Sequence, residues 1–258
     1  MKKAKKKLQK RRSDKAPKKT YGKANDKQSG NVKTQMAEAI KAHQAGQISE
    51  AEAIYNQVLE TNPNHPKALN LLGTIAVSTE NIETGIDLIS RSIALDSEDA
   101  DAHTNLGCAF ILLERHNEAL EEFDHSLTLN PDSPTTLGNR GICLRHIGRT
   151  QDSINSFRRA IILKPELAIA HHNLSFALLS NGQEEEGLAE MEWRWQNPMF
   201  DFTMRDFSKP MWDGTANLND RTLRLWPEQG PGDMIIWASR LEEVIKQSKC
   251  CIVQIYPK

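Results

Sequence analysis

Residues 102–131 read AHTNLGCAFILLERHNEALEEFDHSLTLNP, and residues 136–165 read TLGNRGICLRHIGRTQDSINSFRRAIILKP. A shift of 34 residues places glycine on glycine, phenylalanine on phenylalanine and proline on proline: Gly107 and Gly141, Phe123 and Phe157, Pro131 and Pro165. Self-similarity at a fixed period of 20–50 residues is the signature of a repeat architecture. The spacing between these two segments therefore indicates a repeat of 34 residues.

The spacing extends to five units, which begin near residues 32, 66, 100, 134 and 168. All five units carry a small residue in their first half, namely Ala39, Gly73, Gly107, Gly141 and Ser175. All five carry another in their second half, namely Ala51, Gly85, Ala119, Ser153 and Gly187. A large apolar residue follows four positions later, namely Tyr55, Ile89, Phe123, Phe157 and Met191. This pattern predicts two antiparallel helices per unit, with small residues where they cross and a large side chain filling the gap between units.

The spacing and residue types of residues 32–194 resemble the tetratricopeptide repeat, a 34-residue helix-turn-helix unit. Proline at the end of the second helix suits such a unit, because it has no amide donor and clashes with the preceding turn. The first unit departs from the pattern at Gln35 and Glu38, as expected of a polar cap. The predicted fold is mainly α: a superhelix of five repeats over residues 34–195.

The resemblance implies a concave groove lined by the first helices, and hence a protein- or peptide-binding scaffold. Asparagine recurs there every 34 residues, at Asn105, Asn139 and Asn173. Its amide both donates and accepts, which matches a peptide backbone. The series resembles the asparagine ladder of nuclear O-linked N-acetylglucosamine transferases, and the second unit interrupts it with Leu71, since Asn70 comes one place early. The alternative is that these asparagines face solvent and were copied by duplication.

Residues 1–33 form a basic tail with 14 Lys and Arg against two acids, a charge of +12, whereas the remaining chain carries −13. The tail has too little apolar surface to offset its ordering entropy, so we expect it to be disordered. It suits weak binding to polyanions such as RNA or lipid head groups. The alternative is a solubilising tail, free in solvent or folded back on the acidic body.

The composition changes after the repeats, and all five tryptophans lie at or beyond Trp193. Residues 196–220 show no helical or strand period and indicate an irregular connector. Within residues 221–258, TLRLWP and CCIVQIY have the character of strands, EQGPGD that of a tight turn, and MIIWASRLEEVIKQS that of a helix. Together they predict a short, incomplete βαβ unit of a parallel, Rossmann-like sheet.

The string WRW…P.WDG…LRLW.EQGPGD resembles bacterial proteins in which tetratricopeptide repeats precede a glycosyltransferase-like domain related to the heptosyltransferases. The resemblance implies substrate binding near Gly230 and Gly232, with Asp233 as the general base that deprotonates the acceptor hydroxyl. The alternative is that Asp233 only caps the following helix. The donor half is missing, so the chain needs no cofactor as given and is expected to be inactive. A longer protein would use a nucleotide-sugar donor.

Composition and residue spacing disfavour several classes of protein and of binding site. No apolar run approaches the roughly 18 residues of a membrane span, and the basic start has no apolar core behind it. We therefore expect a cytoplasmic protein. Four cysteines make no disulfide scaffold, and Cys108 and Cys143 suit small buried positions. His171 and His172 are adjacent rather than four apart, so no metal site is predicted, and the loop lacks the dinucleotide fingerprint.

Overall fold

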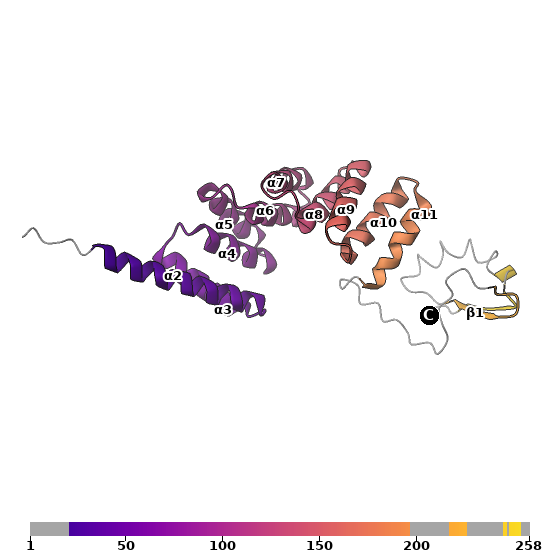
Figure 1. The fold of residues 1–258 in the computed structure, drawn as a ribbon, viewed down its shortest axis with the longest axis horizontal. Helices are drawn as coiled ribbons and strands as arrows, with labels where there is room; N and C mark the ends of the chain where they lie inside the picture. Colours follow the sequence, from indigo (N-terminus) through magenta and orange to yellow (C-terminus); the bar gives the residue numbers. More distant parts are fainter. Residues whose placement is uncertain (1–20, 197–216, 226–244, 247, 254–258) are drawn as a thin grey trace, which may run out of the picture. The chain divides into compact units, whose positions relative to one another are not determined.

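The computed structural model describes residues 21–196, 217–225, 245–246 and 248–253. The chain divides into two compact units, Met1–Gln196 and Asn197–Lys258. The first unit is helical, and the second contributes a pair of short strands (Figure 1).

The described part of the first unit consists of consecutive helix pairs. Their bounds are α2 Tyr21–Gln44, α3 Ile48–Thr61, α4 Pro66–Ser78, α5 Ile82–Leu95, α6 Ala100–Leu112, α7 His116–Leu129, α8 Pro134–His146, α9 Thr150–Leu163, α10 Ala168–Ser180 and α11 Glu184–Met191. A short 3₁₀ helix, η1, follows at Glu192–Gln196. Four first helices begin at the residues where the sequence pattern places the units, 66, 100, 134 and 168. The predicted mainly α fold class and its 34-residue register are confirmed.

The first helix begins earlier than the sequence indicated. We expected disorder through residue 33, whereas α2 starts at Tyr21. No proline lies between Pro17 and Pro63 to stop it. Met36 and Ala39 are buried and anchor the second half of α2. Residues added to an anchored helix extend it without a new nucleation step, which accounts for an extension of α2 to Tyr21.

Close approach of the paired helices depends on their small residues. A Cβ atom added at Gly107 would lie 2.6 Å from Cε1 of Phe123, and one added at Gly141 would lie 2.7 Å from the same atom of Phe157. Both rings are fully buried. The predicted pairing of small and large residues is thus seen directly. Met191 differs from the expectation, since it is only half-buried where α11 gives way to η1.

The turn inside each pair has a left-handed residue at the same repeat position. In three units it is glycine, Gly46, Gly148 and Gly182, with φ of 75°, 79° and 74°. In the second and third units it is Glu80 and Glu114, with φ of 66° and 57°. A residue with a Cβ in this region is strained by roughly 1–2 kcal/mol.

The described part of the second unit contains two parallel strands, β1 Thr222–Leu225 and β2 Cys250–Val253, paired from Thr222–Cys250 to Leu225–Val253. These are the two strands expected of the βαβ unit. The expected turn and most of the expected helix between them lie outside the described residues, as does most of the connector over 196–220.

Replacing the strained glutamate at the third turn should stabilise the repeats. We expect Glu114→Gly to raise the free energy of unfolding by about 1 kcal/mol, because relief of the left-handed strain exceeds the extra freedom that glycine has in the unfolded chain. Gly148→Ala, at the matching turn of the next unit, should lower it by a similar amount. Urea unfolding followed by helical circular dichroism measures both. A loss of stability in Glu114→Gly would contradict the strain argument.

Candidate functional site

The three repeated asparagines lie on α6, α8 and α10, and each is half-buried. Nδ2 of Asn105 donates to Oδ1 of Asn70 at 2.9 Å, and Nδ2 of Asn139 donates to Sγ of Cys108 at 3.1 Å. Both bonds link a first helix to the first helix before it. Nδ2 of Asn173 instead donates to the carbonyl of Ile169 in its own helix, at 2.8 Å. Asn105 and Asn139 therefore bond to the preceding first helix, whereas Asn173 bonds within its own helix. The three amides do not form one continuous hydrogen-bonded row.

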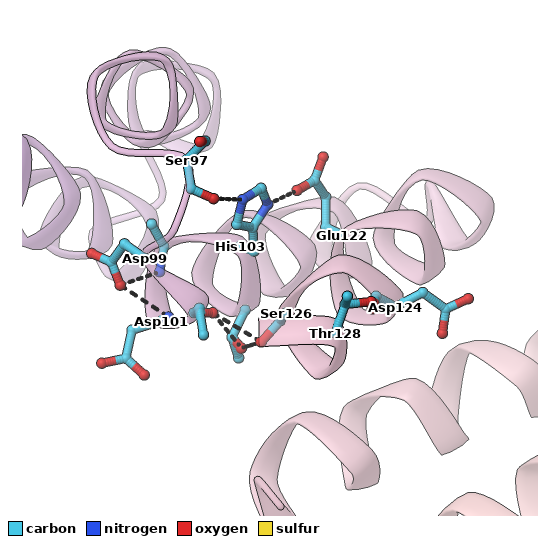
Figure 2. Close-up of polar contacts among 11 residues, drawn as sticks. Ser97, Asp99, Asp101, His103, Glu122, Asp124, Ser126 and Thr128 are labelled. Carbon is cyan, nitrogen blue, oxygen red and sulfur yellow. Dashed lines mark hydrogen bonds and ion pairs between the residues drawn. The ribbon is translucent and has the colours of Figure 1, made fainter. Parts of the chain in front are cut away.

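Asn70, one residue before Leu71, is hydrogen-bonded to Asn105. It is 2% exposed, and its Nδ2 donates to Oδ2 of Asp99 at 3.5 Å while its Oδ1 accepts from Asn105. Asp99 also caps α6 by accepting from the amides of Asp101 and Ala102 (Figure 2). Sequence spacing alone missed Asn70, because a one-residue offset turns a side chain by about 100° around the helix. Only the packing of α4 against α6 brings it back to Asn105.

The amides keep hydrogen-bonding capacity after these contacts. Among the described residues, Oδ1 of Asn105, Asn139 and Asn173 accepts no hydrogen bond. Each side chain also has a second N–H beyond the one used. Half-buried groups with an acceptor and a donor to spare suit a ligand that offers both, as a peptide backbone does.

A buried histidine with two oxygen partners recurs two repeats apart. Figure 2 shows His103 between Glu122 and the backbone of Ser97, with Nδ1 2.7 Å from Oε2 and Nε2 3.3 Å from the carbonyl. His171 has the same environment: Nδ1 lies 2.5 Å from Glu190 Oε2, and Nε2 lies 2.8 Å from the carbonyl of Pro165.

A second ring covers each of these histidines. His125 lies 4.2 Å from His103, and Trp193 lies 3.9 Å from His171, between ring centroids. Histidine, glutamate and covering ring occupy matching repeat positions in the third and fifth units. Because both ring nitrogens of His103 and of His171 have oxygen partners and these two histidines are buried, we assign the arrangement of histidine, glutamate and covering ring, here called the histidine clamp, to the packing of the repeats.

The thiols near the asparagines are shielded. Burial raises the pKa of the Cys108 thiol to about 11, although its hydrogen bond with Asn139 opposes the shift. Burial, reinforced by the neighbouring Cys108, raises the pKa of Cys143 to about 12. Cys143 is completely buried, as expected from the sequence. A thiol with so high a pKa is protonated at neutral pH and is a poor nucleophile.

The predicted residues of the C-terminal unit, Gly230, Gly232 and Asp233, lie outside the described residues. Within the part of the chain that the structure covers, no group of three or more His, Cys, Asp or Glu could hold a metal ion. None of the helices in that same part is both long enough and apolar enough to span a bilayer.

Family models of the tetratricopeptide repeat match residues 42–107 and 100–133. The chain therefore contains tetratricopeptide repeats, as predicted from the 34-residue spacing. The glycosyltransferase-like resemblance of the C-terminal unit has no counterpart among these matches.

Two curated relatives are similar to parts of this chain. Protein FlbA of Caulobacter vibrioides is 24% identical over 245 residues, which covers 81% of this chain and 41% of FlbA. The tetratricopeptide repeat-containing protein trd-1 of Caenorhabditis elegans is 30% identical over 141 residues, 55% of this chain and 18% of that protein. The chain thus spans less than half the length of these relatives.

Solved structures show the same fold at low sequence identity. A crystal structure of MamA has a TM-score of 0.54 and 20% identity, covering 61% of this chain and 92% of MamA. Pseudomonas aeruginosa pilF has a TM-score of 0.60 and 15% identity, covering 66% and 77%. YrrB, described as a TPR protein with an unusual peptide-binding site, has a TM-score of 0.54 and 19% identity, covering 69% and 91%.

The contributions of His103 and Glu122 to the free energy of unfolding should be coupled. We expect His103→Leu to lower the free energy of unfolding by about 1–3 kcal/mol, because Glu122 and the Ser97 carbonyl lose their partner. Adding Glu122→Ser should cost little more, since leucine and serine stand at these positions in the fourth unit. Chemical unfolding of the single and double variants measures the coupling, with the exposed Glu121→Ser as control. Strictly additive losses would contradict the clamp.

Thiol reactivity should follow burial. At pH 8 we expect the exposed Cys250 to react with a maleimide well before Cys108, of which about one molecule in a thousand is then a thiolate. Labelling of Cys108 should accelerate about tenfold per pH unit as pH rises towards 11. Mass spectrometry of labelled peptides, with Cys250→Ser as control, measures the order. Equal rates at pH 8 would contradict the raised pKa.

Proposed function

We propose that the repeats form a scaffold that binds an extended peptide or protein segment along their first helices. The observation that carries the proposal is the set of half-buried amides on α6, α8 and α10, each with an acceptor oxygen to spare. A peptide backbone offers a donor and an acceptor at every residue. Side-chain amides can pair with both.

The repeat spacing supports the same ligand. Packed helices lie about 8–10 Å apart, and an extended chain rises about 3.3 Å per residue. One first helix therefore corresponds to about three residues of bound peptide. Asn105 and Asn139 are each held by a contact to the preceding first helix, at Asn70 and Cys108, so their orientation is set before a ligand arrives. A fixed donor loses less entropy on binding than a free one.

Two narrower functions stay as predictions. The parallel pairing of β1 with β2 supports a βαβ unit, but a fold does not specify a reaction. Glycosyl transfer, with Asp233 as base and Gly230 and Gly232 near the substrate, would further require a donor-binding half. Weak polyanion binding by the basic residues 1–33 rests on their charge alone, and a cytoplasmic location rests on composition.

The peptide-binding proposal is tested by removing the amides together. Peptides that bind the native chain are selected from a random display library, and their Kd is measured by fluorescence anisotropy. We expect the triple variant Asn105→Ala/Asn139→Ala/Asn173→Ala to weaken binding at least about tenfold, because several hydrogen bonds of roughly 0.5–1.5 kcal/mol each are lost.

A matched control removes three exposed asparagines elsewhere, Asn64→Ala/Asn117→Ala/Asn130→Ala. It should change the Kd less than about twofold. Circular dichroism verifies that both triple variants keep their helix content. Selected peptides that bind the first triple variant with native affinity would overturn the role of the amides.

A further inference from the structure

A cleft of about 360 Å³ opens between α7, α8 and α9 and is separate from the asparagines described above. Two arginines, Arg140 on α8 and Arg159 on α9, line it together with Asp124 on α7. Leu127 and Leu137 add apolar wall, and Ser156 adds a hydroxyl. We call this the α8 cleft. Its volume lies in the range of ligand-binding clefts, about 300–1,000 Å³.

The α8 cleft is open because the fourth repeat lacks the histidine clamp. Its neighbours fill the matching positions with histidine, glutamate and a ring, as His103, Glu122 and His125 and as His171, Glu190 and Trp193. The fourth repeat has Leu137, Ser156 and Arg159 instead. Nη2 of Arg159 donates to the carbonyl of Pro131 at 2.9 Å, the carbonyl that matches those bound by the two histidines. The hydrogen bond to the backbone carbonyl is preserved in the fourth repeat. The space that the covering ring and the glutamate fill in the third and fifth repeats belongs to the cleft.

Arg140 departs further from the repeat pattern. The matching residues of the second, third and fifth units are Leu72, Leu106 and Leu174. The Arg140 side chain is 24% exposed, and it donates from Nε to Asp124 at 2.6 Å and from Nη1 to Ser156 at 2.7 Å. A largely buried charge in place of a leucine weakens the core unless it is well paired. Departures of this kind concentrate at functional sites.

Both arginines retain donors. Among the described residues, Nη2 of Arg140 makes no hydrogen bond, and neither Nε nor Nη1 of Arg159 does. The Arg159–Asp132 pair is largely exposed, at 52% and 73%, so water and salt screen it. Two guanidinium groups against the single carboxylate of Asp124 give the lining a net charge of +1. One monoanion neutralises that charge, whereas a dianion overcompensates beside Asp124.

We propose that the α8 cleft binds a single carboxylate on a short aliphatic stem. The planar carboxylate pairs with the free guanidinium N–H groups, which match its geometry. The stem lies against Leu127 and Leu137. This chemistry has two sources, a glutamate side chain of a protein segment or a small free carboxylic acid. The site goes beyond the proposed peptide groove, because Asn139 faces α6 whereas Arg140 pairs with α7 and α9.

Butyrate serves as the probe for the intact chain, in a nuclear magnetic resonance titration at constant ionic strength. We expect it to shift the Nε–H signal of Arg159 and the methyl signals of Leu127 and Leu137, with a Kd of roughly 1–10 mM. Butyramide, its neutral isostere, should leave the Nε–H signal unshifted. Equal shifts with both compounds, or saturation by inorganic phosphate at lower concentration than by butyrate, would overturn a monoanionic carboxylate site.

Two peptides separate the sources. Acetyl-Gly-Glu-Gly-amide is compared with the matched glutamine peptide, which has no charge. Saturation by the glutamate peptide at lower concentration than butyrate supports a protein ligand. Shifts with butyrate but not with the peptide support a small free acid. The absence of shifts with either probe overturns the proposal.

Two single substitutions test whether butyrate binds in the α8 cleft. Arg159→Gln should weaken butyrate binding at least about tenfold, because a charge-assisted contact is lost. Arg158→Gln removes the preceding arginine, which pairs with Glu186 and does not line the cleft, and should leave the Kd within about twofold. Unchanged binding by Arg159→Gln would overturn the site.

A second test fills the cleft with larger side chains. The triple variant Leu137→His/Ser156→Glu/Arg159→His installs the arrangement of the third repeat. We expect it to keep its helical circular dichroism and to lose the butyrate shifts at Leu127. Retained shifts in a folded triple variant would contradict the proposal. The asparagine variants leave this site intact, so failure of the peptide groove and failure of the cleft are distinguishable.

Discussion

The contact between a small residue on the first helix and a ring on the second sets the geometry of these repeats. A Cβ at Gly107 or Gly141 would lie 2.6 or 2.7 Å from the ring of Phe123 or Phe157. Because real Cβ contacts are not so short, the helices reach this separation only with glycine in place. In the second repeat a Cβ at Gly73 would likewise lie 2.7 Å from Cγ1 of Ile89, so these three helix pairs present one another with a similar surface, and the core continues along them.

Because the crossing contacts set the distance between the helices, other positions can vary without loss of the fold. The third and fifth repeats place a buried histidine, such as His103, between a carboxylate and a backbone carbonyl. The fourth repeat keeps the carbonyl contact through Arg159 and leaves a cleft instead. Candidate sites thus arise where one repeat departs from its neighbours, because the crossing contacts already hold the helices at a fixed distance.

Helix α8 illustrates how one element serves two surfaces. Asn139 and Arg140 are adjacent in sequence, about 100° apart around the helix. Asn139 contacts α6, whereas Arg140 contacts α7 and α9. A scaffold built this way offers amides that suit a peptide backbone along its first helices and a positively charged cleft over its second helices. Because their chemistry differs, we expect the two surfaces to select different ligands.

The sequence by itself determined the repeat number, the helix starts at 66, 100, 134 and 168, and the strand pair of the second unit, because these follow from local spacing of small, large and β-branched residues. Tertiary structure alone decided which polar groups meet. Asn70 reaches Asn105, and Arg140 reaches Asp124, through packing of separate helices.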